Sequence, residues 1–357
     1  MRWPRCRVRI RADGPCLGPL QYAGEELRQQ VGAIADVVVR SFRTIIPFLG
    51  SYRSQELTSK SREEFKKDLP TKYANLAVIY HLHDPEDTLG HLDDEFFSML
   101  PESCKYICHC EYPLLRHGEP ALMPFEVGAG YDDVDVIAAH KHGVSVTHTP
   151  GAVDDATATT AIFLILSSMR RFWAAEKSCR AGNWKKGLPL ARDPEGKTLG
   201  IVGMGGIGKV VARRMREWGM KVVYYNRREL DPKPDFECEY MSSLDELLKV
   251  ADVVSLHMPV SSPLFLHLSA ITHPPIQLNS QTAGSFSTAQ FAAMKDNSVL
   301  VNTARGGVID EPALIETLKK GDKLWAVGLD VFPNEPEINP ELMKFDNVTL
   351  LPHMGTE

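Results

Sequence analysis

Three polar side chains with complementary chemistry follow three strand-like segments near the end of the sequence. Arg305 follows "VLVNTA", Glu335 follows "AVGLDVFPN" and His353 follows "VTLLP". A guanidinium group can hold a carboxylate and polarise a keto oxygen, an imidazolium can donate a proton, and a carboxylate can orient the imidazole. Together these groups suit the reduction of a 2-oxo acid. Each alone is usually a solvated surface residue, so the hypothesis depends on their joint placement.

A glycine-rich segment, "GIVGMGGIGK", follows an apolar strand-like run and opens a helical pattern. Gly203 allows a tight turn, Gly205 lets the backbone approach a pyrophosphate, and Gly208 lets helix and sheet pack closely. The N–H groups of Gly206 and Ile207 are then expected to meet the phosphates. The spacing alone is weak, but in this strand-turn-helix setting it predicts dinucleotide binding.

The next strand-like segment, "KVVYY", is followed by Asn226, 18 residues beyond Gly208, and then by Arg227 and Arg228. An NAD site usually has an acidic residue here to accept hydrogen bonds from the adenosine ribose 2′-hydroxyl. A carboxylate would repel a 2′-phosphate, whereas guanidinium groups bind phosphate through charge-assisted hydrogen bonds. We therefore expect NADP(H) to be the preferred cofactor, with NAD(H) as the alternative. The competing interpretation is that both arginines are ordinary solvated residues after a strand.

From Thr198 onward, short apolar runs alternate with helical patterns, which predicts a parallel, doubly wound α/β sheet. The expected strands are residues 198–205, 221–225, 252–258, 298–302, 325–331 and 348–351. Expected helix starts are Gly206, Ser243 with Glu246 as a capping box, Ser287 with Gln290 as a second box, and Asp310 with Pro312 in the first turn. Because ligands of open parallel sheets bind beyond the carboxyl ends of the strands, residues there should converge on one site. Thr303 and Asp330, at two of these ends, are further candidate cofactor contacts, Asp330 for the nicotinamide carboxamide.

The region before Pro150 has strand and helix patterns but no glycine fingerprint, so we expect residues 1–150 to form a second, smaller α/β domain and residues 151–352 the dinucleotide-binding domain. The long apolar run "ATATTAIFLILSS" is too short and too rich in Thr to cross a bilayer, and we expect a buried helix.

Composition excludes several functional classes. The 357 residues carry a formal net charge of −6, which gives no general reason to bind nucleic acid or an anionic membrane surface. Seven cysteines without regular spacing favour a reducing compartment, so we expect a cytoplasmic protein. The arginine-rich start "RCRVRIR" alternates like an edge strand, although organelle (mitochondrial) targeting is an alternative. The cluster Cys104, Cys108, His109 and Cys110 lacks the spacing of structural zinc, so no metal site is expected.

Four segments, "GIVGMGGIGKVVARR", "VNTARGGVIDEPAL", "GLDVFPNEP" and "LLPHMG", resemble the D-isomer-specific 2-hydroxyacid dehydrogenase family in both sequence and order. The resemblance extends from about Gly128 and is nearest to the glyoxylate/hydroxypyruvate reductase branch. It implies a Rossmann domain paired with a flavodoxin-like substrate domain, assembled as a homodimer. Arg305, Glu335 and His353 match the family's catalytic residues. The segment "VGAGYD" is similar to the loop that binds the substrate carboxylate through backbone N–H groups, which implicates Ala129 and Gly130.

The expected activity is NADPH-dependent reduction of glyoxylate or hydroxypyruvate to the D-2-hydroxy acid. One alternative is a reductase for bulkier acids, of the mandelate or branched-chain type. Another is a nucleotide-sensing, corepressor-like binding protein, which would share the fold and could retain the three polar residues.

The chain departs from the family pattern in three places. Extra segments intervene near residues 110–126 and 261–281, and only residues 354–357 follow His353, where the family continues through a helix back to the substrate domain. Neither extra segment has clean amphipathic periodicity. One hypothesis is that both are translated introns and that residues 353–357 are the stub of that return. The alternative is that both are genuine surface loops.

Overall fold

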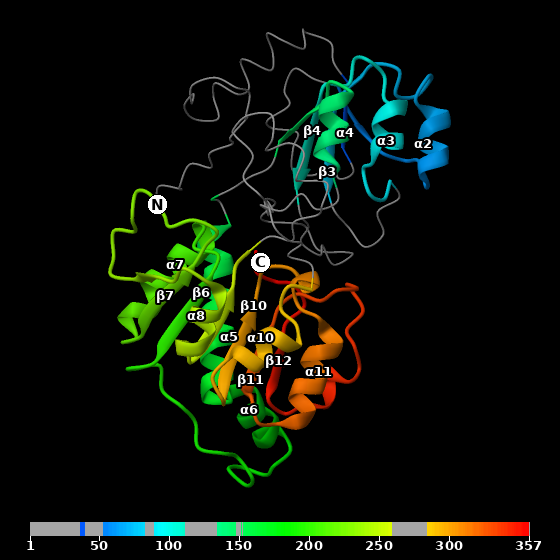
Figure 1. Ribbon diagram of the computed structural model, residues 1–357. Helices are drawn as coiled ribbons and strands as arrows, with labels where there is room; N and C mark the ends of the chain where they lie inside the picture. Colours follow the sequence, from blue (N-terminus) through cyan, green and yellow to red (C-terminus); the bar gives the residue numbers. More distant parts are fainter. Residues whose placement is uncertain are drawn as a thin grey trace, which may run out of the picture. The chain divides into compact units, whose positions relative to one another are not determined.

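The computed structural model describes residues 36–39, 53–82, 89–110, 134–147, 151, 153–258 and 284–356. Four segments named above lie wholly or almost wholly outside these residues: the arginine-rich start, the loop with Ala129 and Gly130, and the two extra segments near residues 110–126 and 261–281. The chain divides into two compact units, with the boundary between Val153 and Asp154. Figure 1 labels the elements of both units.

The first unit contains a five-stranded parallel sheet. Its strands are β1 (Asp36–Val39), β2 (Arg53–Glu56), β3 (Leu76–Leu82), β4 (Tyr106–Cys110) and β5 (Ser145–Thr147). Their order is β2-β1-β3-β4-β5, and every pairing is parallel. This is the strand order 2-1-3-4-5 of flavodoxin-like sheets. The expected flavodoxin-like fold of the N-terminal part is therefore confirmed.

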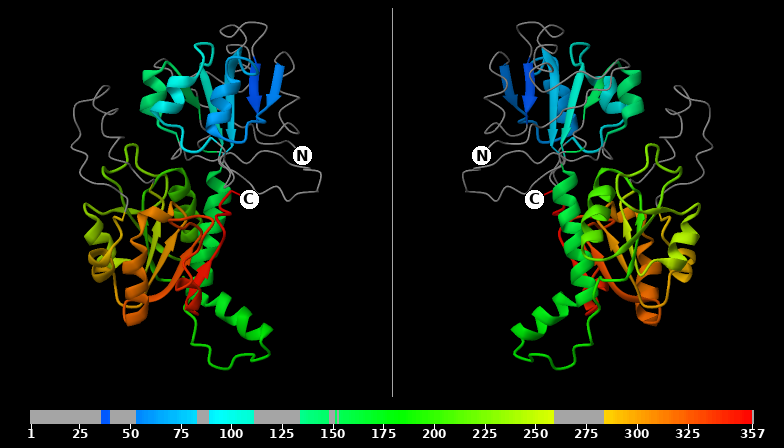
Figure 2. Two further views of the ribbon diagram at one scale, coloured as in Figure 1. Left: turned by 90° about the vertical axis from the view of Figure 1, so that its right-hand side faces the viewer. Right: turned by 90° about the vertical axis from the view of Figure 1, so that its left-hand side faces the viewer.

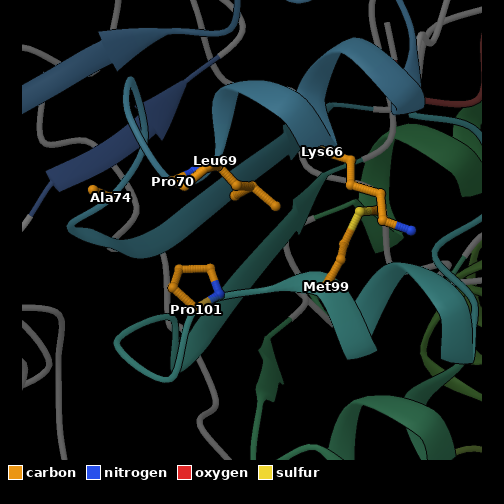
Figure 3. Close-up of a pocket in the computed structure, with 6 residues that line it drawn as sticks. All are labelled: Lys66, Leu69, Pro70, Ala74, Met99 and Pro101. Atoms are coloured by element: carbon orange, nitrogen blue, oxygen red, sulfur yellow. The ribbon is translucent and has the colours of Figure 1, made fainter.

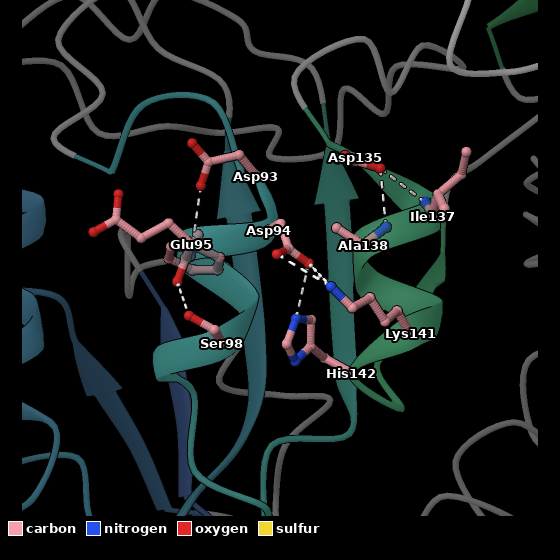
Figure 4. Close-up of polar contacts among 10 residues, drawn as sticks. Asp93, Asp94, Glu95, Ser98, Asp135, Ile137, Ala138, Lys141 and His142 are labelled. Atoms are coloured by element: carbon pink, nitrogen blue, oxygen red, sulfur yellow. Dashed lines mark hydrogen bonds and ion pairs between the residues drawn. The ribbon is translucent and has the colours of Figure 1, made fainter.

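Short helices pack on this sheet: α2 (Arg62–Asp68), α3 (Asp94–Met99) and α4 (Val136–Lys141). Asp93 and Asp135 cap α3 and α4 by accepting hydrogen bonds from backbone N–H groups of the first turns, as Figure 4 shows. Asp94 of α3 also accepts from Lys141 and contacts His142, both at 3.0 Å. These contacts tie α3 to α4 above a core that includes Phe65, Phe96 and Ile107.

The second unit is built on a seven-stranded parallel sheet. Its strands are β6 (Thr198–Val202), β7 (Lys221–Tyr225), β8 (Glu239–Tyr240), β9 (Val253–Leu256), β10 (Ser298–Asn302), β11 (Leu324–Leu329) and β12 (Val348–Leu350). The order is β12-β11-β10-β9-β6-β7-β8. The chain thus runs outward in one direction from β6 and in the other from β9, which is the Rossmann arrangement, and the crevice for a ligand lies where the order reverses. The predicted doubly wound sheet is confirmed.

Helices cover both faces of this sheet (Figures 1 and 2). Buried side chains of α5 (Asp154–Arg170) and α7 (Gly206–Glu217) form a core on one face. Those of α8 (Leu244–Val250), α10 (Thr288–Ala293) and α11 (Glu311–Lys320) form a core on the other. The unit also contains α6 (Phe172–Arg180) and two single 3₁₀ turns, η2 (Gly306–Val308) and η3 (Leu342–Lys344). Strand residues alternate between the two cores, as expected for a sheet covered on both sides.

Most predicted helix starts are observed. α7 begins at Gly206, Asp310 caps α11 by accepting from Ala313 N–H, and Gln290 Oε1 accepts from Ser287 N–H ahead of α10. The predicted box at α8 is only half formed. Ser243 accepts from Glu246 N–H, but the Glu246 carboxylate accepts from Ser242 rather than from Ser243. Glu246 therefore still accepts a hydrogen bond from a backbone N–H group at the start of α8, that of Ser242 instead of Ser243.

The predicted helix over residues 156–168 is part of α5, which buries Ala161, Leu164 and Ile165 but leaves Phe163 exposed. Among the helices that the structure describes, none has the length and apolar character needed to cross a membrane.

Candidate active site

The glycine-rich turn joins β6 to α7 at the carboxyl edge of the seven-stranded sheet. Gly203 has φ of +101°, and a Cβ there would lie 2.8 Å from the backbone of His257. A Cβ on Gly208 would lie 2.4 Å from Gly203 O. A Cβ on Gly205, by contrast, would meet no atom within 4 Å. The first and third glycines are therefore required by the fold, whereas Gly205 opens the backbone toward the space where a pyrophosphate would bind.

Asn226 lies directly after β7 and contacts the glycine turn. Its Oδ1 accepts a hydrogen bond of 2.7 Å from Met204 N–H, and its carbonyl accepts one of 3.3 Å from the Tyr240 hydroxyl. Because the side-chain oxygen is held by the turn, the NH₂ group is the part of the amide directed away from Met204. Asn226 thus presents a donor, not an acceptor, to its remaining surroundings.

Arg227 and Arg228 follow Asn226 and are both exposed. The nearby carboxylate of Glu229 forms its ion pair with Lys233 at 2.9 Å. Among the ion pairs of the described residues, none involves Arg227 or Arg228. Their positive charges are therefore not neutralised by these neighbours at the end of β7.

Arg305 lies in a short turn after β10 that the Asn302 side chain organises. Asn302 Oδ1 accepts from Ala304 N–H at 3.0 Å, and Asn302 Nδ2 donates to Arg305 O at 2.8 Å. A Cβ on the next residue, Gly306, would lie 1.9 Å from the backbone carbon of Phe332, so this turn is in direct contact with the segment after β11. The Arg305 guanidinium donates to Ala304 O at 2.8 Å and is half-buried.

Glu335 and His353 form a hydrogen-bonded pair. Glu335 Oε2 lies 2.7 Å from His353 Nδ1, and Glu335 Oε1 accepts a 2.7 Å bond from Phe332 N–H. About a third of each side chain is exposed, at 34% for Glu335 and 36% for His353. Burial raises the pKa of Glu335, but the His353 bond and charge, the Phe332 N–H and the Arg305 charge outweigh it and lower the pKa overall. The carboxylate is thus held ionised beside the imidazole.

Asp330 directly follows β11 and is 1% exposed. Its Oδ1 accepts a 2.9 Å hydrogen bond from Met354 N–H. Burial raises the pKa of Asp330 to about 6, against the lowering effects of the Met354 and Gly355 N–H groups and of the His353 charge. Asp330 therefore fixes the backbone immediately after His353 and acts electrostatically on the Glu335–His353 pair.

Several features of this edge fit a dinucleotide. Besides the open space at Gly205, Thr303 is buried, and its Oγ1 has no hydrogen-bond partner among the described residues. A buried hydroxyl without a partner is unusual and is satisfied when a ligand supplies the missing group. Thr303 and Asp330 would hold the nicotinamide end, and the turn at Gly203–Gly208 the phosphates.

The structure thus brings together Arg305, Asp330, Glu335 and His353, and it lines up the glycine turn and Asn226 along the same sheet edge. Ala129 and Gly130 lie outside the described residues. Sequence reasoning missed Asn302, although an Asn directly after an apolar strand is a signal for a side chain that caps the following turn. It also missed Asp154, whose carboxylate contacts Gly206 and for which the sequence carries no comparable signal.

A shallow pocket of about 510 Å³ in the first unit is not part of this site (Figure 3). It is lined by residues at the ends of α2 and α3, among them Leu69, Met99 and Pro101. Ala74, also in its lining, precedes β3, so the pocket lies at the amino ends of the strands. Ligands of α/β sheets bind at the opposite, carboxyl ends, and we do not assign this pocket to the substrate.

No group of three or more metal-ligating side chains occurs in the described part of the chain. Cys104 is buried, and burial raises the pKa of its thiol to about 12. Cys108, His109 and Cys110 belong to β4.

Comparisons with known proteins identify the family. The model for "D-isomer specific 2-hydroxyacid dehydrogenase, NAD binding domain" matches residues 162–263 and 266–355, more than half of the chain. The relative 4-methyl-2-oxopentanoate reductase A of Aspergillus oryzae is 38% identical over 302 residues, covering 84% of this chain and 80% of the relative.

Two solved structures extend the comparison. A glyoxylate reductase from Paecilomyes thermophila is 36% identical, with a TM-score of 0.77, covering 91% of this chain and 90% of that one. The holo form of Rhodotorula graminis D-mandelate dehydrogenase is 29% identical, with a TM-score of 0.76, covering 91% and 89%. The sheet order, the glycine turn and these matches define a dinucleotide-binding oxidoreductase. The chain belongs to the D-isomer-specific 2-hydroxyacid dehydrogenase family, as its motifs predicted.

Proposed function

We propose that this protein is an NADPH-dependent reductase that converts a small 2-oxo acid, glyoxylate or hydroxypyruvate, to the D-2-hydroxy acid. The observation that carries the proposal is the 2.7 Å contact between Glu335 Oε2 and His353 Nδ1, with the Arg305 charge acting on the same carboxylate. An acid, its orienting carboxylate and a cation for the substrate carboxylate are the groups that this reaction requires. The similarity to the glyoxylate reductase from Paecilomyes thermophila supports the choice of a small substrate.

The roles follow from the contacts. The bound cofactor supplies the hydride. Arg305 would bind the substrate carboxylate through its fork of N–H donors and polarise the keto oxygen. Because His353 Nδ1 is bonded to Glu335, the proton that reaches the keto oxygen would come from Nε2. Glu335 would keep the imidazole oriented and stabilise its protonated form. Backbone N–H groups at Ala129 and Gly130 would also bind the substrate carboxylate, as the resemblance of "VGAGYD" to the family's loop implies.

The preference for NADPH is supported by the groups at the end of β7. Asn226 directs its NH₂ donor away from Met204, and Arg227 and Arg228 add two exposed positive charges. A 2′-phosphate offers acceptor oxygens and negative charge, so it matches these donors, whereas a 2′-hydroxyl gains nothing from the charge.

The arginines can be tested directly. The double variant Arg227→Gln/Arg228→Gln should raise the Kd for NADPH by about 10- to 100-fold and leave that for NADH within about twofold. Arg213→Gln, which removes an exposed arginine from α7 that pairs with Asp235, is the matched control for lost positive charge. Equal weakening of both cofactors in the double variant would contradict recognition of the 2′-phosphate.

The alternative substrate class, bulkier 2-oxo acids, is favoured by the similarities to the 4-methyl-2-oxopentanoate reductase and the D-mandelate dehydrogenase. The deciding experiment is a panel of glyoxylate, hydroxypyruvate, 4-methyl-2-oxopentanoate and phenylglyoxylate, each with NADPH and with NADH. The proposal expects the highest kcat/KM for one of the first two with NADPH. Higher kcat/KM for a bulky acid would favour the alternative, and tight cofactor binding without turnover of any acid would favour a nucleotide-sensing protein.

We also propose a homodimer, formed through α6 and its flanking segments. None of the residues of α6 is buried, and a nine-residue helix with so little buried surface is marginally stable in water. Large apolar side chains are exposed on this helix, on α5 and on the segment that follows: Phe163, Phe172, Trp173, Trp184 and Leu190. Figure 2 shows α6 projecting from the end of α5 away from the sheet of its own unit.

An apolar projection of this kind suits a second copy of the chain. Sedimentation analysis should give twice the chain mass, and Trp173→Ser/Trp184→Ser should shift the protein toward monomer. A monomeric wild type across the assay concentrations would refute the dimer.

A further inference from the structure

The carboxylate of Asp154, the first residue of α5, lies against the first turn of α7. A Cβ placed on Gly206 would be 2.1 Å from Asp154 Oδ2 and 2.7 Å from Oδ1. Gly206 is not one of the three glycines of the fingerprint, which are Gly203, Gly205 and Gly208. A larger residue at position 206 would therefore have to displace this carboxylate from the N-terminus of α7.

Asp154 has no hydrogen bond or ion pair with the residues that the structure describes. Its neighbour Asp155 behaves differently, because the Asp155 carboxylate pairs with Arg214 of α7. Arg214 also donates to Asp155 O at 3.1 Å and to Thr159 Oγ1 at 3.0 Å, so this cation is already engaged. Asp154 is thus a half-buried carboxyl group without a partner, beside the N–H groups that the fingerprint assigns to the pyrophosphate.

An ionised Asp154 would oppose the pyrophosphate. Two like charges about 4 Å apart repel by about 4 kcal/mol at the effective dielectric constant of a partly exposed protein site. A neutral carboxylic acid would instead offer one O–H donor to a phosphate oxygen. Burial, and secondarily the charge of Asp155, raise the pKa of Asp154 before any ligand is bound, and a nearby pyrophosphate would raise it further.

We propose that Asp154 binds the pyrophosphate of the cofactor as a neutral carboxylic acid, so that cofactor binding takes up a proton. The proposal rests on the NAD-binding domain alone, independently of the substrate and of the preference for NADPH. The charged groups that act on this position are Asp155 on α5 and, through it, Arg214 on α7. Asp330 also lies near the first turn of α5, because a Cβ on Gly355 would be 3.2 Å from both Asp330 Oδ2 and Thr157 Cγ2, and His353 lies beside Met354, whose N–H donates to Asp330.

The test measures binding rather than turnover. Isothermal titration with NADH in buffers of different ionisation enthalpy gives the number of protons taken up, and NADH is used because it lacks a 2′-phosphate that itself titrates near neutral pH. Wild type should take up protons on binding at about pH 7–8. Its affinity should fall by up to about tenfold per pH unit between the pKa of Asp154 in the free protein and its higher pKa in the complex.

Asp154→Asn keeps the shape and a donor but cannot ionise. It should bind NADH with affinity similar to wild type at about pH 5.5, about tenfold or more tightly than wild type at about pH 8.5, and without the Asp154 proton uptake. Asp155→Asn is the matched control and should retain proton uptake, since its carboxylate pairs with Arg214. NADPH should show the same difference between wild type and Asp154→Asn, because the pyrophosphate is common to both cofactors.

Two results would overturn the proposal. Unchanged proton uptake and unchanged affinity in Asp154→Asn would mean that Asp154 does not contact the pyrophosphate. Weaker binding by Asp154→Asn at about pH 8.5 would mean that the ionised carboxylate is needed, for example as an acceptor for a ribose hydroxyl. Thermal melting of each variant separates both results from a failure to fold.

Discussion

Both carboxylate oxygens of Glu335 are occupied by specific partners: Oε2 by His353 Nδ1 and Oε1 by Phe332 N–H, each at 2.7 Å. The first contact crosses 18 residues of sequence and joins the loop after β11 to the loop after β12. The second anchors the carboxylate to its own loop. An imidazole held in this way has one nitrogen and one orientation available for proton transfer, which is what a general acid requires.

Glu335→Gln should retain the acceptor for Phe332 N–H but remove the negative charge beside His353. The protonated imidazole is then less stable, so the pH at which the reduction rate falls to half should move down by about one unit or more. A pH profile of kcat for reduction measures this shift. Glu337→Gln, an exposed carboxylate two residues later, is the control and should leave the profile in place. An unshifted profile in Glu335→Gln would mean that the charge of Glu335 does not support the acid.

Arg305→Lys should keep one positive charge but lose the planar fork of donors. We expect kcat/KM to fall by about 10²- to 10³-fold, because an ammonium group cannot bind a carboxylate bidentately and polarise the keto oxygen at once. NADPH affinity should remain within about twofold, since Arg305 lies after β10 rather than at the glycine turn. Steady-state kinetics with a parallel cofactor titration separate the two effects, and near-normal turnover would exclude Arg305 from substrate binding.

The sequence was sufficient to predict most elements of the second unit, although it did not predict α6 or β8, and the expected strand 198–205 ends at Val202. α7 starts at the predicted Gly206, and β6, β7 and β10 lie where the apolar runs place them. These elements are encoded locally, by strand-turn-helix glycines, side-chain caps and apolar periodicity. Because parallel strands all end at one edge of the sheet, the convergence of Asp330, Glu335 and His353 also follows from local patterns.

Contacts between distant segments were not predictable in the same way. Asp154 against Gly206 and Asn226 against Met204 depend on how α5 and β7 pack beside the glycine turn. No spacing rule relates such residues. The Glu246 carboxylate likewise accepts from Ser242 instead of Ser243, because a flexible side chain can reach either neighbour. Local sequence patterns therefore predict the helices and strands, but not which of several nearby groups a side chain contacts.

Asp330 should make stability depend on pH near neutrality. Its pKa is raised to about 6 in the folded protein, mainly by burial, from about 3.9 when unfolded. Between about pH 4 and 6 the folded state binds more protons than the unfolded state, so the free energy of unfolding should rise as pH falls from about 6 toward 4. Above about pH 6 Asp330 is ionised in both states, and its burial then lowers the free energy of unfolding by the full amount. Asp330→Asn should therefore raise the free energy of unfolding by on the order of 1–3 kcal/mol at about pH 8 but much less near pH 4.

Urea unfolding of wild type and Asp330→Asn at several pH values checks this difference. The side-chain amide of the variant would still offer an oxygen to Met354 N–H but not a second one to Gly355 N–H, so the charge is isolated by the change of the difference with pH rather than by its size. Glu335 has the opposite effect on stability. Its pKa is lowered in the folded protein, so the stability that it contributes is lost as pH falls below the ordinary pKa of a glutamate. A difference between the two proteins that does not vary with pH would show that Asp330 does not titrate in this window.

Alanine substitutions at Gly306 and Gly205 should distinguish a glycine that the fold requires from a glycine that ligand binding requires. A Cβ on Gly306 would lie 1.9 Å from the backbone carbon of Phe332 and 2.2 Å from its oxygen, and backbone cannot move aside as a flexible side chain can. Gly306→Ala should therefore cost about 2 kcal/mol or more of unfolding free energy. It should also lower kcat/KM, because Phe332 N–H holds Glu335 and the adjacent residue is Arg305.

Gly205→Ala is the converse case, since its Cβ would meet no atom within 4 Å and its φ of −84° suits any residue. We expect a stability change below about 1 kcal/mol, the cost of a poorer helix cap, but a large loss of affinity for NADPH and NADH alike, because the methyl group would occupy the space that the pyrophosphate needs. Thermal unfolding and cofactor titration of both variants measure the two effects. If Gly205→Ala bound cofactor normally, the phosphates could not lie against this turn, and the assignment of the cofactor site would fail.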